Sequence, residues 1–195
     1  LQFKLCNLKD INHTISRLAT SVVIDDIELY EVKSLALLSA DVKNILEKIS
    51  LDKIIAIPNL DDVVKILDPD GLHIATFYIY DSYSEELALL RKKLKEKDVY
   101  QEEIYNEVMR IEDEIRDELS SKLKPYSEAM TSALNALADV DINIAKSLQM
   151  KELGLCFPTI SSKNISSYKG IFHPEVKSIL EKEKREYQKV DIDFV

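Results

Sequence analysis

Residues that mark particular protein classes are scarce in this 195-residue chain. Glycine occurs only at Gly71, Gly154 and Gly170, whereas sandwiches and barrels with many tight turns need more of it. Cysteine occurs only as Cys6 and Cys156, which are too few and too far apart for a disulfide framework or a metal site. These absences favour long helices with few connections, in a reduced, cytoplasmic environment.

Long apolar runs and an excess of positive charge are also missing. No stretch of about 18 apolar residues could span a membrane, and no signal peptide is recognisable. The net charge is −9, whereas a dedicated duplex-DNA binder usually carries a basic surplus that neutralises phosphates. We therefore expect no membrane partner, and any contact with nucleic acid must come from a local basic patch.

Apolar residues at helical spacing dominate the first half of the chain. They predict one helix over about 8–20, capped by Asn7, and a longer one over about 25–50, with acidic residues in its first turn. A short helix is expected after Asn59, and another over about 84–97, where residues 82–85 have the spacing of a capping box. The expected fold class is therefore mainly α.

Residues 76–80, Thr-Phe-Tyr-Ile-Tyr, are the best strand candidate because they are β-branched and aromatic, although they could equally form an extended segment. They follow a turn predicted at 68–71, where Pro69 and Gly71 suit the required backbone angles. An aromatic cluster in this region could serve as a stacking platform for nucleobases. Because no basic residues are interleaved with it, we interpret it as the edge of a packed core; it comprises Phe77, Tyr78, Tyr80 and Tyr83.

A narrow apolar stripe runs from Ile104 to Leu148, with successive apolar positions three or four residues apart and one lapse at Asp141. As one helix it would be about 70 Å long, so we expect part of it to project as an arm. Pro125 predicts a kink near 122–124 because proline lacks the backbone N–H and clashes with the preceding turn. The acidic residues 112–114 are interpreted as a solvated face, with Glu112 and Arg116 as an i,i+4 pair.

The sequence changes character after Gly154. Residues around Pro158 and the polar run 161–164 predict irregular structure, and residues 165–172 could form a strand. A helix is expected over about 175–184, and the alternating residues 190–195 predict a final strand. The predicted domains are a helical core over 1–81, lever helices over 82–150, and a return to the core over 151–195.

No motif for catalysis is present. The sequence contains neither the phosphate loop G-x-x-x-x-G-K-S/T, nor the nucleophile elbow G-x-S-x-G, nor the zinc motif H-E-x-x-H. The three histidines, His13, His73 and His173, fall in different elements, whereas a metal site needs converging ligands. We predict no catalytic, cofactor-binding or metal-binding residue and no small-molecule substrate for this chain.

A basic cluster is the sharpest local feature of the sequence. It has two interpretations: bases that suit the negative end of a helix dipole, or a phosphate contact at the tip of the arm. Residues 98–118 hold nine acids and two bases, which would keep DNA away from the rest of the arm. The candidate DNA-binding residues are Arg91, Lys92, Lys93, Lys95 and Lys97.

Several segments, in order, resemble the MutS family of DNA mismatch-repair proteins. Residues 127–145 are similar to the returning lever helix, whose typical core is Ala-Leu-Ala-Glu/Asp-Leu-Asp and is here Ala-Leu-Ala-Asp-Val-Asp at 136–141. Residues 124–126 resemble the preceding Pro-Tyr/His, and 156–158 resemble the Cys-x-Pro that follows. His173 and Pro174 match the end of a Gly-Arg-His-Pro box, and 68–71 with 84–91 are similar to the entry into the descending lever.

The resemblance implies a core and lever segment without its ATPase domain, with both ends of this chain cut from a longer protein. That protein is expected to be a homodimeric, cytoplasmic ATPase that takes ATP and Mg²⁺ in the missing domain and binds DNA. This segment would couple the ATPase state to DNA binding without catalysis of its own. One departure matters: only residues 98–101 separate the two levers, where the family usually inserts a β-rich clamp.

A second hypothesis requires no DNA. The stripe over 104–148 is also typical of a helical protein-interaction or dimerisation module, in which it would form the seam with a partner helix.

Overall fold

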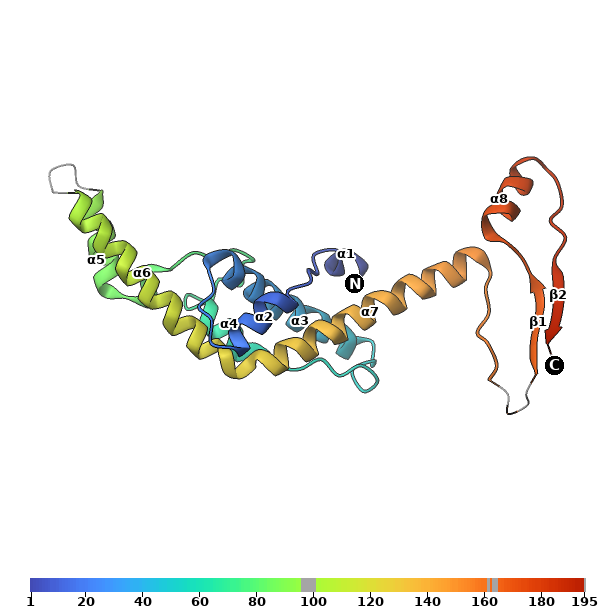
Figure 1. Cartoon of the computed structure of the whole chain (residues 1–195), viewed down its shortest axis with the longest axis horizontal. Coiled ribbons are helices and arrows are strands. Elements are labelled where there is room, and N and C mark those ends of the chain that lie inside the picture. Colours follow the sequence, from blue (N-terminus) through green and yellow to red (C-terminus); the bar gives the residue numbers. More distant parts are fainter. Residues whose placement is uncertain (96–100, 161, 163–164, 195) are drawn as a thin grey trace. The chain divides into compact units, whose positions relative to one another are not determined.

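The computed structural model describes residues 1–95, 101–160, 162 and 165–194. It divides into two compact units, residues 1–144 and 145–195, which we describe separately. Both units contain helices, and the only sheet in the described part of the chain has two strands (Figure 1). The predicted mainly α fold class is confirmed.

Helices of very different length build the first unit. The three longest are α3, α6 and α7, with 23, 23 and 27 residues, and the residues of α7 from 145 onward are grouped with the second unit. The bounds are α1 Gln2–Leu5, α2 Asn12–Ala19, α3 Asp26–Lys48, α4 Asp61–Leu67, η1 Asp81–Tyr83, α5 Glu85–Leu94, α6 Gln101–Leu123, η2 Lys124–Tyr126 and α7 Ser127–Leu153.

Capping explains where several helices begin. α3 begins at the acidic residues, as predicted, and with a capping box: the Asp25 side chain accepts the N–H of Glu28 while the Glu28 side chain accepts the N–H of Asp25. Ser84 caps α5 by accepting the N–H of Leu87, whereas the predicted capping residue Ser82 lies in η1. Asn59 accepts the N–H of Asp61 at the start of α4.

The prediction of a helix from residue 8 capped by Asn7 was wrong. The N–H groups of Asn7 and Leu8 donate to carbonyls of the preceding turn, those of Lys4 and Leu5. Asp10 then accepts the N–H of Asn12, and α2 begins at that residue. The acid two residues before the helix therefore satisfies the first N–H, and α2 starts one turn later than expected.

The stripe predicted from Ile104 onward is helical but not a free arm over most of its length. α6 ends at Leu123, and Pro125 lies in the 3₁₀ turn η2 before α7 begins, which confirms the predicted break. Between Val108 and Val140 the apolar positions of the two helices are buried in one core with α2, α3, α4 and α5. Residues 1–81 and 82–144 thus share a single hydrophobic core.

The strand predicted over 76–80 is not formed; the segment is extended without a sheet partner, the alternative that the sequence allowed. The β-branched and aromatic side chains of this segment pack against the helices instead, and Ile79 and Tyr80 are buried in the core. The turn before it is confirmed: the N–H of Gly71 donates to the carbonyl of Asp68 at 3.0 Å, and Gly71 has φ +64°.

The second unit contains the end of α7, two strands and one helix. β1 Ser166–Ile171 and β2 Val190–Phe194 form an antiparallel pair in which Tyr168 lies opposite Ile192, and α8 Pro174–Lys182 connects them. Both strands and this helix were predicted at these places. Figure 1 shows α8 at one end of the strands and not across either face of the sheet.

Candidate nucleic-acid interface

Arg91, Lys92 and Lys93 lie in the last turn of α5 and Lys95 directly follows it, but these residues are not equivalent. Lys92, Lys93 and Lys95 are exposed, and none forms an ion pair with another described residue. Lys97 lies outside the described residues. Three exposed ammonium groups within four residues can contact phosphate oxygens. Their exposure therefore suits a contact with a nucleic-acid backbone.

Arg91, the first residue of the cluster, forms its contacts within the chain. Its guanidinium donates to the carbonyl of Ile79 at 2.8 Å and to Glu112 at 2.7 Å, and it also pairs with Asp81. Its side chain is only 25% exposed. Arg91 thus ties α5 to both the extended segment and α6, and its charge is already neutralised.

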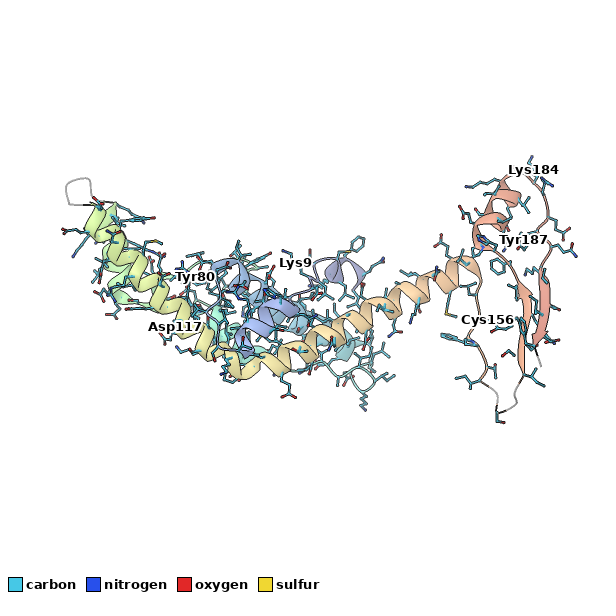
Figure 2. The ribbon with its side chains drawn as sticks, viewed as in Figure 1. Lys9, Tyr80, Asp117, Cys156, Lys184 and Tyr187 are labelled. Atoms are coloured by element: carbon cyan, nitrogen blue, oxygen red, sulfur yellow. The ribbon has the colours of Figure 1, made fainter. Side chains whose placement is uncertain are left out.

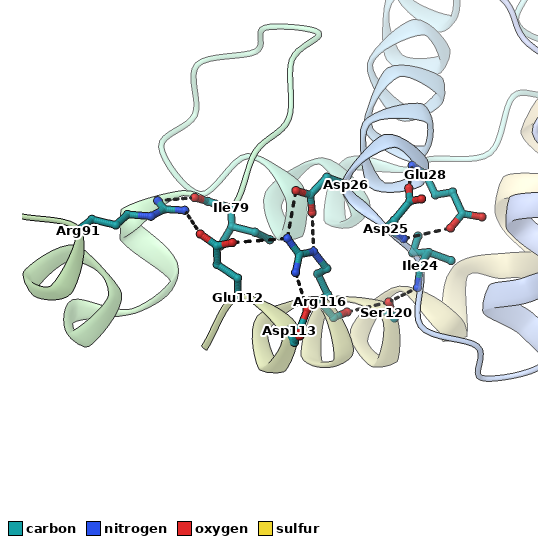
Figure 3. A network of polar contacts seen from close by, with 10 residues as sticks. All are labelled: Ile24, Asp25, Asp26, Glu28, Ile79, Arg91, Glu112, Asp113, Arg116 and Ser120. Carbon is teal, nitrogen blue, oxygen red and sulfur yellow. Dashed lines mark hydrogen bonds and ion pairs between the residues drawn. The ribbon is translucent and has the colours of Figure 1, made fainter. Parts of the chain in front are cut away.

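Arg116 forms a second junction next to Arg91 (Figure 3). It binds Asp26 at the start of α3 at 2.7 Å, Asp113 at 2.6 Å and Glu112 at 3.6 Å. One turn later Ser120 accepts the N–H of Ile24 at 3.1 Å. A continuous row of polar contacts therefore fastens α5, α6 and α3 together.

Glu112 lies at the centre of this row. The predicted pair with Arg116 is present, but the interpretation of Glu112 as a solvated residue was wrong, because its side chain is only 15% exposed and also accepts Arg91. Its neighbours Asp113 and Glu114 are exposed, as expected. The error arose because Arg91 of α5, which pairs with Glu112, lies 21 residues earlier in the sequence.

A buried ion pair was missed altogether. Lys33 is fully buried, and its ammonium donates to Asp68 at 2.9 Å and to the hydroxyl of Tyr80 at 3.0 Å. Burial opposes the charge of Lys33, but the bonds to Tyr80 and Asp68 outweigh it and raise the pKa of Lys33. Burial opposes the charge of Asp68 as well, yet Lys33 and the N–H of His73 lower the pKa of Asp68 below its usual range.

This buried pair joins α3 to the end of α4 and to the extended segment. The signal in the sequence was that Lys33 lies four residues after the buried Leu29 and three before the buried Ala36, on the apolar face of α3. The partner, however, is 35 residues away, so the spacing alone identifies neither Asp68 nor the bond.

The aromatic cluster is the edge of the core, as interpreted from the sequence. Tyr80 is buried, and Phe77 and Tyr83 pack beside it with ring centroids 5.9 Å away in each case. Figure 2 shows Tyr80 among the side chains of the helical core. Burial raises the pKa of Tyr83, whose hydroxyl donates to the carbonyl of Ile66. These rings are therefore used in packing, and only Tyr78 is more than half exposed.

The first unit also contains a cavity of about 460 Å³, bounded by the segment before α2, by α3 and by the loop after Gly71. Among its charged residues Lys4 pairs with Asp41, and Lys9 lies over the ring of Tyr30. The described residues contain no group of three or more His, Cys, Asp or Glu that could hold a metal ion.

Among the described residues, none of the helices has the length and apolar character needed to cross a membrane. No family model matches the chain, and neither a curated protein nor a solved structure matches it.

Proposed function

We propose that this chain is the non-catalytic core and lever segment of a MutS-like DNA mismatch-repair or recombination ATPase, and that it couples the ATPase state to DNA binding. The proposal rests on the ordered series of segments that resemble the family, from residue 68 to Pro174. The whole protein would be a cytoplasmic homodimer that binds DNA and uses ATP and Mg²⁺ in a domain outside this segment.

The observation that carries the proposal is the form of residues 127–145, the segment with the strongest resemblance. They lie within α7, an unbroken helix of 27 residues that begins directly after the turn at Pro125. A continuous helix transmits displacement over its length without internal rearrangement, which suits a lever.

The contacts of Arg91 and Arg116 support the same role. They join α5 and α6 to the start of α3 through side chains that are 25% and 17% exposed. Such partly buried, multiply bonded arginines hold packed helices in one arrangement more firmly than isolated surface pairs. A displacement of α6 would therefore carry α3 and α5 with it.

A softened α7 tests the coupling. In the full-length protein, Asn135→Gly with Asp139→Gly changes two exposed positions of α7 and weakens the helix by about 1 kcal/mol at each relative to alanine. DNA binding and basal ATP hydrolysis should persist separately, whereas the stimulation of hydrolysis by DNA should fall. Asn135→Ala with Asp139→Ala is the matched control and should retain stimulation. Equal stimulation in both variants would contradict the role of α7 as a lever. A full-length protein without a phosphate loop would contradict the proposal that it is an ATPase.

The alternative function is a helical dimerisation module with the stripe as its seam. The structure disfavours this form of the alternative, because the stripe residues Ile111, Leu119 and Leu137 are covered by helices of the same chain. A second copy could reach them only after the core had opened.

A further inference from the structure

The apolar face of the second unit's sheet is not covered by other described residues of that unit. Residues opposite one another in an antiparallel pair share a face, so one face carries five large apolar side chains, each at least 39% exposed. They are Tyr168, Ile171, Val190, Ile192 and Phe194. A two-stranded sheet is at best marginally stable by itself, so this face and its edges call for a further element.

The other face is acidic along β2. Asp191 and Asp193 lie on it, and Asp191 accepts the N–H of Gly170 at 2.6 Å. Asp193 forms no ion pair with any other described residue. β1 is less suited to receive a strand, because its pairing is irregular between Tyr168 and Ile171 and such a bulge disrupts an edge. The free edge of β2 is therefore the regular one.

A second copy of the chain does not fit this edge. In any pairing that overlaps at least three residues of β2 with the same strand of a second copy and keeps the apolar residues on one face, an aspartate lies beside an aspartate, in antiparallel and parallel orientation alike. Shifting the register by one residue separates the aspartates but places Ile192 on the acidic face. Like charges directly opposite one another destabilise a sheet, so the pairing of β2 with β2 of a second copy is unfavourable.

We propose that the free edge of β2 receives a strand of different sequence, in which apolar residues alternate with lysine or arginine. The apolar residues would extend the face of Ile192 and Phe194, and the bases would lie beside Asp191 and Asp193. This inference does not depend on the proposed MutS-like function, since it uses only the register and charge of the second unit.

Labelled peptides test the proposal on the full 195-residue chain, by fluorescence anisotropy together with hydrogen exchange of the amides of 190–194. The peptide Lys-Val-Lys-Val-Lys-Val should bind and protect these amides. Glu-Val-Glu-Val-Glu-Val should bind about tenfold more weakly or worse, as expected when two cross-strand charge pairs change from attraction to repulsion. The peptide Val-Asp-Ile-Asp-Phe stands for a second copy and should not bind.

Two controls separate strand addition from attraction to the acidic first unit, which has 28 acidic against 17 basic residues. Lys-Lys-Lys-Val-Val-Val has the same charge without alternation and should not protect 190–194. Asp193→Lys leaves one acid and one base on this face and should therefore abolish the preference between the two alternating peptides, whereas Asp141→Lys, at an exposed position of α7, should preserve it. Equal binding of both alternating peptides to the unchanged chain, binding without protection of β2, or tight binding of Val-Asp-Ile-Asp-Phe would each overturn the proposal.

Discussion

The two units of the chain place their apolar side chains differently. In residues 1–144, Val32, Leu87 and Leu137 are among many that are completely covered. In the described part of 145–194 no residue is buried, although the apolar residues there are just as large. Both units have amphipathic helices, so amphipathic pattern alone does not produce a core; a core needs elements that meet across long stretches of sequence.

One carboxylate introduced into each unit tests this difference in burial most directly. Ile111→Asp places an unpaired charge in the core of the first unit and should destabilise it by about 4 kcal/mol or more. Ile179→Asp makes the same change on α8, where the side chain is half exposed, and should cost less than about 0.5 kcal/mol. Urea unfolding measures both; equal costs would show that the second unit is also covered.

The largest polar effect is expected at Lys33. Lys33→Met leaves the Asp68 carboxylate buried without its ion-pair partner and should cost about 3 kcal/mol. Lys33→Met with Asp68→Asn removes both charges and should recover much of the loss. If the double variant were no more stable than the single one, the unpaired carboxylate would not be the cause.

The pH dependence of the free energy of unfolding tests the same ion pair between Lys33 and Asp68. The lowered pKa of Asp68 means that its contribution is present above its ordinary value of 3.8 and is lost as the pH falls through the folded value below it. The raised pKa of Lys33 means that its contribution is present below 10.5 and lost above it. The double variant should therefore lose less stability on acidification below pH 3.8 than the unchanged chain.

The sequence predicted the elements better than their partners. The helical spacing of the apolar residues was sufficient to predict α3, α6 and α7, and Pro125 was sufficient to predict the break between α6 and α7, because these signals are local in the sequence. The prediction of a strand over 76–80 was wrong because a strand needs a hydrogen-bonding partner strand, which the β-propensity of the segment itself does not provide. Lys33 and Glu112 were missed for a related reason, since each is buried by residues far away in the sequence.

The candidate interface was predictable only in part. A basic cluster is visible in the sequence, and its exposed lysines on α5 agree with that pattern. The sequence could not separate Arg91 from them, because the bonds of Arg91 to Ile79 and Glu112 depend on how α5 packs. Whether the remaining lysines contact DNA stays a prediction.

A smaller effect on stability is expected from the arginine junctions. Arg116→Ala removes the bond between α6 and the start of α3 and leaves Glu112 less well paired, at a cost of about 2 kcal/mol. Arg110 is the matched control: it forms two ion pairs on the exposed side of the same helix, and Arg110→Ala should cost less than about 1 kcal/mol. Thermal unfolding of both variants compares the contacts of Arg116 with the surface ion pairs of Arg110. A larger loss of stability for Arg110→Ala than for Arg116→Ala would contradict this prediction.

The smallest effect on stability, and the most informative for function, concerns the exposed lysines of α5. Replacing Lys92, Lys93 and Lys95 by Gln should change the free energy of unfolding by less than about 0.5 kcal/mol, because none has a partner among the described residues. In the full-length protein the same variant should weaken DNA binding equally for all sequences. Each lost phosphate contact should also reduce the slope of log affinity against log salt by about 0.9. Arg91→Gln is the contrasting variant: it should lower stability through the lost bond to Glu112 and leave the salt slope unchanged. A slope altered by Arg91→Gln but not by the lysine variant would place the DNA contact elsewhere.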